Sequence, residues 1–241
     1  MKAMIYTGGL ESRMQPGSSD EPRALVEING EPLLGMLIRR LADKGFDDII
    51  VNVHHFAGRI HEFLRNRDFG NVSVKISEET SLVLDSGGGL KKVAGFFDNN
   101  RPFLVYNLEV LSDVDLDLLY QRHTSSGALA TLVVRERGST RFMLFDDDMR
   151  LCGWQNLETG ETSVYRGSPR NMRKLAFSRI QVISPLLLSL INERGAFSLV
   201  DIYLRLAKDH TITGYADNES IWMDLARKEG IIEAEKLFRK N

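Results

Sequence analysis

The sequence predicts an α/β fold in which helices cover a mainly parallel central sheet. Short apolar runs typical of buried strands alternate along the chain with segments of helical periodicity, and this order implies right-handed crossovers between parallel strands. The chain has 241 residues, 43% of them hydrophobic and 27% charged, which is enough to bury a large core. No repeat, low-complexity segment or linker divides the sequence, so we expect one domain over residues 1–241.

The alternation is clearest in the first half of the chain. A strand is expected over residues 3–7, because a short apolar run ends there at Gly8 and Gly9. A helix is expected over residues 33–44, where apolar residues recur on one face and Gly45 follows as a stop signal. The pattern continues with a strand at 48–53, a helix at 57–66 and a strand at 72–77.

The second half continues the series with less regular spacing. Asp113, Asp115 and Asp117 alternate with apolar residues and indicate a solvated helix start. The acidic run at 146–148 follows an apolar segment and is typical of a hairpin turn rather than of a metal site. The elements expected here are a helix at 89–95, strands at 103–106, 129–135 and 142–145, and helices at 184–193, 198–208 and 229–239.

Charge and cysteine content narrow the classes of partner and compartment. The chain carries 31 Lys plus Arg against 33 Asp plus Glu, a net charge of -2, which argues against nucleic acid or an anionic membrane as partner. The single cysteine, Cys152, adjoins Leu151 and Trp154 and is expected to be a packed thiol. No segment approaches the roughly 20 apolar residues of a membrane span, and no signal peptide is apparent, so we expect a cytoplasmic protein. The sequence leaves a homo-oligomer open.

The turn after the first strand is the first candidate for chemistry. A strand that runs into glycines presents backbone N–H groups to a phosphate, and here Gly8 and Gly9 open such a turn. Arg13 would add a permanent charge with forked donors for phosphate oxygens. By itself this pattern is as typical of a plain tight turn as of a phosphate site.

Further motifs spread over the chain make the pattern more specific. They are the turn with Gly9, Arg13 and Pro16, the segments Pro22-Arg23-Ala24-Leu25 and Asn29-Gly30-Glu31-Pro32-Leu33, residues 51–57, Leu84-Asp85-Ser86-Gly87-Gly88-Gly89, residues 103–109, and Trp222-Met223-Asp224. Together they resemble the signature of the NTP-dependent sugar-1-phosphate nucleotidyltransferases. The likeness is to the compact single-domain branch, which includes N-acetylmuramate-1-phosphate uridylyltransferases and mannose-1-phosphate guanylyltransferases. It implies a three-layer, Rossmann-like nucleotide-diphospho-sugar transferase fold.

The resemblance also implies a reaction. The phosphate of a sugar-1-phosphate attacks the α-phosphorus of an NTP, with UTP favoured by the similar branch, and pyrophosphate leaves with the assistance of Mg²⁺. The implied catalytic cations are Arg13 and Arg23, and the implied Mg²⁺ ligands are Glu109 and Asp224. Asn107 and Arg179 would lie on the sugar-phosphate side. The implied nucleotide-binding residues are Gly8, Gly9, Leu10, Glu11, Ser12, Asp85, Gly87, Gly88 and Gly89.

Several residues depart from the family pattern, and the departures gather in the implied site. Glu11 replaces a glycine and adds a carboxylate beside the phosphates, a repulsion of roughly 3 kcal/mol at about 5 Å. Glu109 replaces an aspartate, and Arg179 stands at a glycine position, where it would clamp an acidic sugar or block the pocket. Two functions follow: an active nucleotidyltransferase that makes an NDP-sugar, or a relative without catalysis that binds a nucleotide, sugar phosphate or protein. We expect the first, because arginines and Asp224 still provide a charge set for phosphoryl transfer.

Two further features have structural interpretations. Adjacent residues on a strand point to opposite faces, so His54 and His55 are not expected to share a metal ion. From its neighbours alone, Asp224 would be interpreted as a helix N-cap, and only the resemblance makes it a metal ligand.

Overall fold

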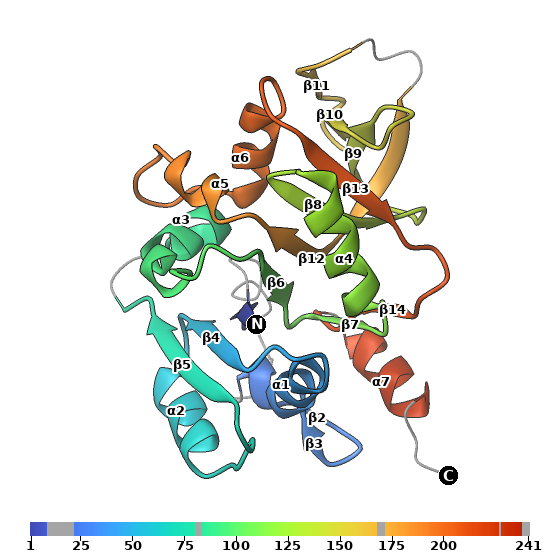
Figure 1. Ribbon diagram of the computed structural model, residues 1–241. Helices are drawn as coiled ribbons and strands as arrows, with labels where there is room; N and C mark the ends of the chain where they lie inside the picture. The colour runs from blue at the N-terminus through green and yellow to red at the C-terminus, as the bar shows by residue number, and fades with distance from the viewer. Residues whose placement is uncertain (9–21, 81–82, 168–171, 227, 238–241) are drawn as a thin grey trace.

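The computed structural model describes residues 1–8, 22–80, 83–167, 172–226 and 228–237. A long sheet runs through the molecule, with helices on both of its faces (Figure 1). Its parallel part consists of β6 (Phe103–Asn107), β1 (Lys2–Tyr6), β4 (Asp48–Val53) and β5 (Ser73–Glu78), in that order. The expected α/β fold with a mainly parallel central sheet is confirmed.

An antiparallel extension continues the sheet beyond β6. The long strand β12 (Arg173–Ile183) pairs with β6 and also with β8 (Ala130–Arg135) and β9 (Arg141–Phe145). The outer strands are β10 (Leu151–Asn156) and β11 (Thr162–Val164) beyond β9, and β13 (Ile212–Ala216), which runs parallel to β8. Two short antiparallel pairs join β2 (Glu27–Ile28) to β3 (Glu31–Pro32) and β7 (Val110–Ser112) to β14 (Trp222–Asp224).

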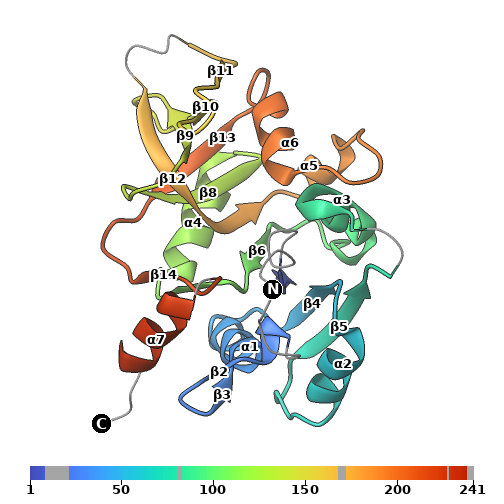
Figure 2. The same cartoon turned by 180° about the vertical axis from the view of Figure 1, so that it is seen from behind.

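The helices form a layer on each face of the sheet (Figures 1 and 2). Because side chains alternate along a strand, Ala3 and Ile5 of β1 enter one core while Met4 and Tyr6 enter the other. The first core is packed by α1 (Leu33–Asp43), α2 (Ala57–Arg65), α4 (Leu116–Ser126) and α7 (Lys228–Leu237). The second is packed by α3 (Asp85–Lys92), α5 (Leu186–Ser189) and α6 (Leu199–Leu206). Short 3₁₀ helices, η2 (Arg23–Leu25) and η3 (Ala94–Phe96), complete the described elements.

Two helix boundaries differ from those that the sequence predicts. The helix expected at 89–95 begins at Asp85, and it packs so closely that a Cβ on Gly87 would lie 2.4 Å from the Phe197 ring. The glycines are therefore helical residues in a close contact rather than a loop. The helix expected at 184–193 is reduced to the single turn of α5.

The strand position assumed for the two adjacent histidines is wrong. His54 and His55 lie beyond the end of β4, so strand alternation does not apply to them, and their ring centroids are 4.2 Å apart. The His54 Nδ1 atom lies 2.6 Å from the Glu79 carbonyl oxygen.

Other local predictions are confirmed. Asp115 caps α4, because its Oδ1 accepts the backbone N–H groups of Asp117 and Leu118. The acidic run forms the turn between β9 and β10, where Asp146 Oδ1 accepts the Arg150 N–H at 2.7 Å. Cys152 is a buried free thiol, and burial raises its pKa.

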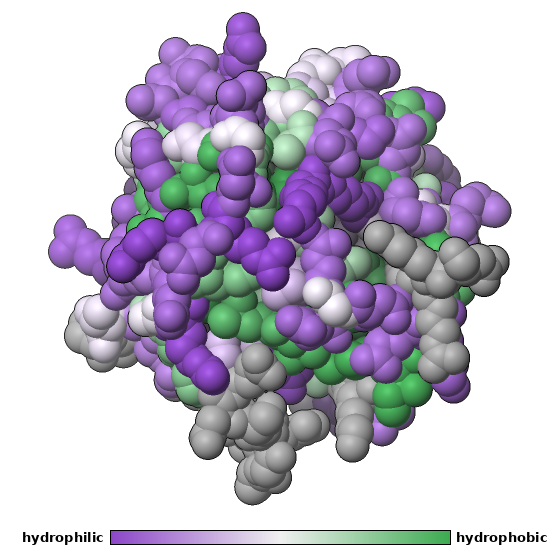
Figure 3. Space-filling view, turned by 90° about the horizontal axis from the view of Figure 1, so that it is seen from below, coloured by the Kyte–Doolittle hydropathy of each residue, from purple (hydrophilic) through white to green (hydrophobic). Residues whose placement is uncertain are grey.

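The surface agrees with the balanced composition. The face seen from below carries many hydrophilic residues, with apolar areas between them (Figure 3). None of the helices in the described ranges combines the length and the apolar character needed to cross a bilayer.

A buried histidine makes part of the stability depend on pH. His123 lies in the interior of α4, with Nδ1 2.9 Å from the Thr131 hydroxyl oxygen, and burial lowers its pKa from 6.5 to about 4. The unfolded chain therefore takes up this proton at a higher pH than the folded chain does. The free energy of unfolding falls as the pH drops from about 6.5 to about 4, and this group causes no further loss below that range.

We predict that His123 alone removes up to about 3 kcal/mol of unfolding free energy between pH 7 and pH 4, as measured by urea denaturation. His123→Gln should flatten this pH dependence, whatever its stability at pH 7. His210→Gln, which alters a half-buried histidine on another segment, should keep it. Equal slopes for wild type and His123→Gln would refute the assignment.

Candidate functional site

The implied site residues meet where strands β1 and β6 end. Gly8 follows β1 and is exposed, Asn107 is the last residue of β6, and Arg179 lies on β12 beside the end of β6. In open α/β sheets, ligands bind outside the carboxyl ends of the strands. The described part of the chain therefore concentrates these residues at the edge where a ligand is expected. The predicted residues Gly9, Leu10, Glu11, Ser12 and Arg13 lie outside the described ranges.

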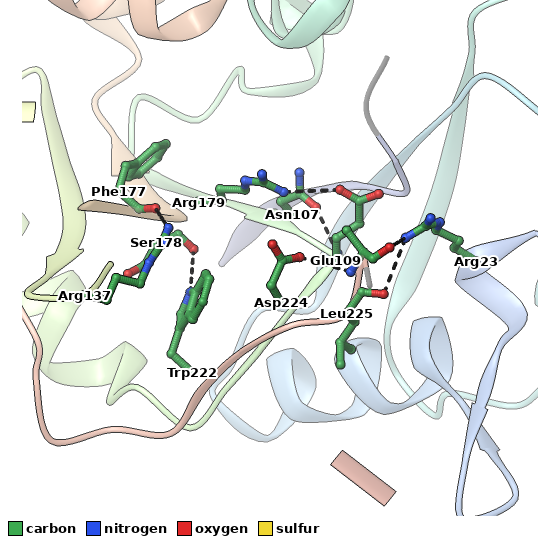
Figure 4. A network of polar contacts seen from close by, with 11 residues as sticks. Arg23, Asn107, Glu109, Arg137, Phe177, Ser178, Arg179, Trp222, Asp224 and Leu225 are labelled. Atoms are coloured by element: carbon green, nitrogen blue, oxygen red, sulfur yellow. Dashed lines mark hydrogen bonds and ion pairs between the residues drawn. The ribbon is translucent and has the colours of Figure 1, made fainter. Parts of the chain in front are cut away.

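Glu109 is held by hydrogen bonds on both sides of the turn between β6 and β7. Its N–H donates to Asn107 Oδ1 at 2.9 Å, and its carbonyl oxygen accepts the Leu225 N–H at 2.7 Å. Strand β14 places Asp224 opposite Val110. Residues far apart in the sequence therefore become neighbours, and the side chains of Glu109 and Asp224 share one region (Figure 4).

The Glu109 carboxylate forms an ion pair with Arg179. Its Oε2 lies 3.3 Å from Arg179 Nη1, and the carboxylate side chain is only 8% exposed. Arg179 has a φ of 59°, the left-handed conformation that glycine adopts most easily. It sits where the register of β12 against β8 is interrupted between Phe177 and Gln181, so this irregularity directs the guanidinium toward Glu109.

Asp224 ends β14 and organises the turn that follows. Its Oδ1 accepts the Ala226 N–H at 3.0 Å, whereas α7 begins only at Lys228, so the N-cap interpretation is wrong.

Arg137 contacts the ring of Trp222 in the same strand as Asp224. Its guanidinium lies 4.1 Å from the centroid of the Trp222 ring. Burial, and then the positive charge of Arg179, lower the pKa of Arg137, while the Asp224 carboxylate opposes them. The two arginines and Asp224 are thus in electrostatic contact.

Arg23 links the N-terminal part of the chain to the same turn. Its Nη1 donates to the carbonyl oxygens of Leu225, at 3.4 Å, and Ala226. A small hollow lies at this junction; the residues that line it are Thr7, Arg23, Leu33, Leu108, Glu109 and Leu225. A wider, open groove between α2 and β5 is separated from β6 by the two strands β1 and β4, and it contains none of the predicted site residues.

The glycines of α3 approach protein rather than open space. A Cβ on Gly88 would lie 2.5 Å from the Gly195 carbonyl oxygen, and one on Gly89 would lie 2.9 Å from Glu79 Oε1. The buried Glu79 carboxylate accepts from Asn52 Nδ2 at 2.9 Å and from the Leu84 N–H at 2.8 Å, which fixes the start of α3. Asp85, the first residue of the helix, has a φ of 57°.

Sequence reasoning did not single out Arg137 beside Asp224 or Glu79 at the start of α3, and it did not anticipate the cation–π contact of Trp222. Arg137 is a common residue type in an ordinary local sequence, and only the folded chain brings it to Trp222 and Asp224. A weak signal existed for Glu79, since an acidic residue directly after a strand and shortly before a glycine run occupies a place typical of a loop anchor.

Among the described residues of the site, the carboxylates that could bind a metal ion are those of Glu109 and Asp224. Within the described ranges, no group of three or more His, Cys, Asp or Glu side chains converges as a metal site would require. Glu109 and Asp224 are oxygen donors of the type that Mg²⁺ prefers, but Arg179 already neutralises the first.

Comparison with known proteins gives consistent results. Residues 2–145 match the family model described as nucleotidyl transferase. The chain is 27% identical over 243 residues to the N-acetylmuramate alpha-1-phosphate uridylyltransferase of Caulobacter vibrioides, covering 97% of this chain and 95% of that protein. It is 34% identical over 126 residues to the enzyme of that name from Neisseria meningitidis, covering 52% of this chain and 54% of that protein. The crystal structure of HddC from Yersinia pseudotuberculosis complexed with GMP-PN has a TM-score of 0.75 at 19% identity, covering 99% of both chains.

A pair of helical glycines tests the placement of Asp224. A Cβ on Gly230 of α7 would lie 2.0 Å from the Asp224 carbonyl oxygen, whereas Gly58 of α2 has open space around it. We predict that Gly230→Ala lowers the free energy of unfolding by about 1–3 kcal/mol, since α7 must move away from the turn. Gly58→Ala should raise it by about 0.5–1 kcal/mol. Urea denaturation measures both, and a Gly230→Ala protein as stable as Gly58→Ala would contradict the packing.

Proposed function

The chain belongs to the nucleotidyl transferase family, and from this premise we propose that it transfers a uridylyl group from UTP to a sugar-1-phosphate. An oxygen of the sugar phosphate attacks the α-phosphorus of UTP, the bond to the β-phosphate breaks, and pyrophosphate leaves. The choice of UTP rests on the uridylyltransferases that the chain resembles, one of them over nearly its whole length.

The observation that carries the proposal is the meeting of three separate segments at the end of β6. Arg23, Glu109 and Asp224 come from the N-terminal, middle and C-terminal parts of the chain, and their backbones are hydrogen-bonded or paired at one place. Phosphoryl transfer requires mainly alignment and charge neutralisation, which such a junction of charged side chains can supply. Arg13 and the glycine turn would complete it on the triphosphate side.

The metal that the family implies does not fit Glu109 as the side chains stand. The family is generally Mg²⁺-dependent, and Mg²⁺ requires oxygen ligands at about 2.1 Å in octahedral geometry. The Glu109 carboxylate instead holds the Arg179 guanidinium, and Asp224 Oδ1 holds a backbone N–H. We therefore assign no step of the reaction to a metal on Glu109.

The same ion pair favours a second candidate function, in which the chain binds a nucleotide or sugar phosphate without turnover. Arg179, whose backbone conformation favours glycine, adds a side chain beside β6 and neutralises the Glu109 carboxylate. Turnover separates the two functions.

We predict pyrophosphate release from UTP, with Mg²⁺ in the buffer, when an acidic or neutral hexose-1-phosphate is present, and at least tenfold lower kcat/KM with GTP. Asp224→Asn keeps an oxygen that can accept the Ala226 N–H but removes the negative charge that would attract Mg²⁺ to this turn, so the rate should fall on the order of 100-fold. Asp148→Asn, in the exposed hairpin turn, is the control and should leave the rate unchanged. Stabilisation of roughly 2.7 kcal/mol by UTP at 100 times its Kd, with no pyrophosphate, would instead establish the binding function.

A further inference from the structure

We propose that the Arg179 guanidinium takes the position on Glu109 that a divalent cation would otherwise occupy. The bound nucleotide then contacts this guanidinium instead of a carboxylate-bound metal ion. The inference rests on the proposed function for the identity of the nucleotide. Its first consequence, the loss of a metal site in the free protein, does not depend on turnover.

The ion pair places the Arg179 guanidinium beside the Glu109 carboxylate. Arg179 Nη1 lies 3.3 Å from Glu109 Oε2, and Figure 4 shows the guanidinium directed at this carboxylate. A positive partner stabilises a carboxylate that is only 8% exposed, because an uncompensated charge is costly to remove from water. Glu109 is the one hydrogen-bond partner that the described part of the chain gives to the Arg179 side chain. At 37% exposure, that side chain keeps donors available for a second anion.

The backbone supports a specific role for this arginine. A φ of 59° disfavours every residue with a Cβ, and it occurs here inside a strand, where the pairing of β12 with β8 is interrupted. Strained conformations of this kind persist only where the surroundings compensate for them. Glycine would adopt the same backbone without strain, but it could not place a charge on Glu109.

The charges around Arg179 disfavour a metal ion on Glu109. Glu109 and Asp224 contribute two negative charges, and Arg179 and Arg137 contribute two positive charges in electrostatic contact with them. Arg23 adds a further positive charge at the same turn. A divalent ion on Glu109 would therefore approach a set that is already neutral or positive, and it would have to displace the guanidinium.

The first test is a titration with Mn²⁺ alone, without nucleotide, followed by the electron paramagnetic resonance of the free ion. Wild type should show no saturable site below about 1 mM, while Arg179→Gln and Arg179→Gly should each gain one that binds at least tenfold more tightly. Glu109→Gln added to either variant should abolish the gain. Arg173→Gln is the matched control, because Arg173 lies on the same strand and pairs with the exposed Glu136 at 3.5 Å. It should behave as wild type.

The second test measures UTP binding by calorimetry with EDTA and with Mg²⁺. Wild type should bind with affinities within about threefold in the two conditions. Arg179→Gln should lose at least tenfold in EDTA and recover with Mg²⁺, a rescue that a merely structural role would not produce.

Either of two results overturns the inference. One is a Mn²⁺ site in wild type as tight as in the variants. The other is a pair of cooperatively folded Arg179 variants that gain no site. Failure of pyrophosphate release would remove the proposed function but would leave the Mn²⁺ result unaffected, so the two failures are distinguishable.

Discussion

The hydrogen bond from the Leu225 N–H to the Glu109 carbonyl oxygen, at 2.7 Å, holds the candidate site together. It continues the pairing of β14 with β7, so the C-terminal part of the chain returns to the end of the first parallel strands. Arg23 then fastens the N-terminal part to the next two carbonyl oxygens. Without this junction, Asp224 would have no fixed position relative to Glu109, and the two carboxylates would belong to unrelated surfaces.

The junction places unlike charges in a partly dry environment, and this determines how the site works. A buried carboxylate is stabilised by a cation or by hydrogen-bond donors, and the Glu109 carboxylate contacts a guanidinium. The Arg179 guanidinium compensates the charge of the buried Glu109 carboxylate, and it also changes which ligands the site can bind. Glu109 and Arg179, two positions at which the resemblance implies another residue, thus contact one another.

Much of the fold follows from local patterns. The apolar runs of β1, β4 and β6 and the one-sided helix α1 are buried on the faces that the periodicity indicates, and Asp115 caps α4 as its spacing predicts. Strand β12 escaped prediction because Ser178 and Arg179 interrupt its alternation at the irregular pairing with β8. The helix expected at 89–95 begins earlier, at Asp85, and its glycines permit the close approach of the segment containing Phe197.

The site is less predictable, for a physical reason. The family resemblance implies that Glu109 and Asp224 belong together, but it carries no information about which side chain approaches them from β12. The partner of a buried charge is decided by sheet register and by a left-handed residue, and both are properties of the folded chain. The contact between the His54 and His55 rings shows the same limit, since both residues follow the end of β4, where strand alternation no longer applies.

The irregularity in β12 also has an evolutionary consequence. Ile180 and Val182 anchor the strand in the core on one side of it, so residue 179 can change without altering the register of the sheet. A single base change converts an arginine codon into a glycine codon, and the left-handed backbone accepts the smaller residue readily. One mutation at position 179 can thus replace the arginine cation with a bound metal cation, while the fold stays the same.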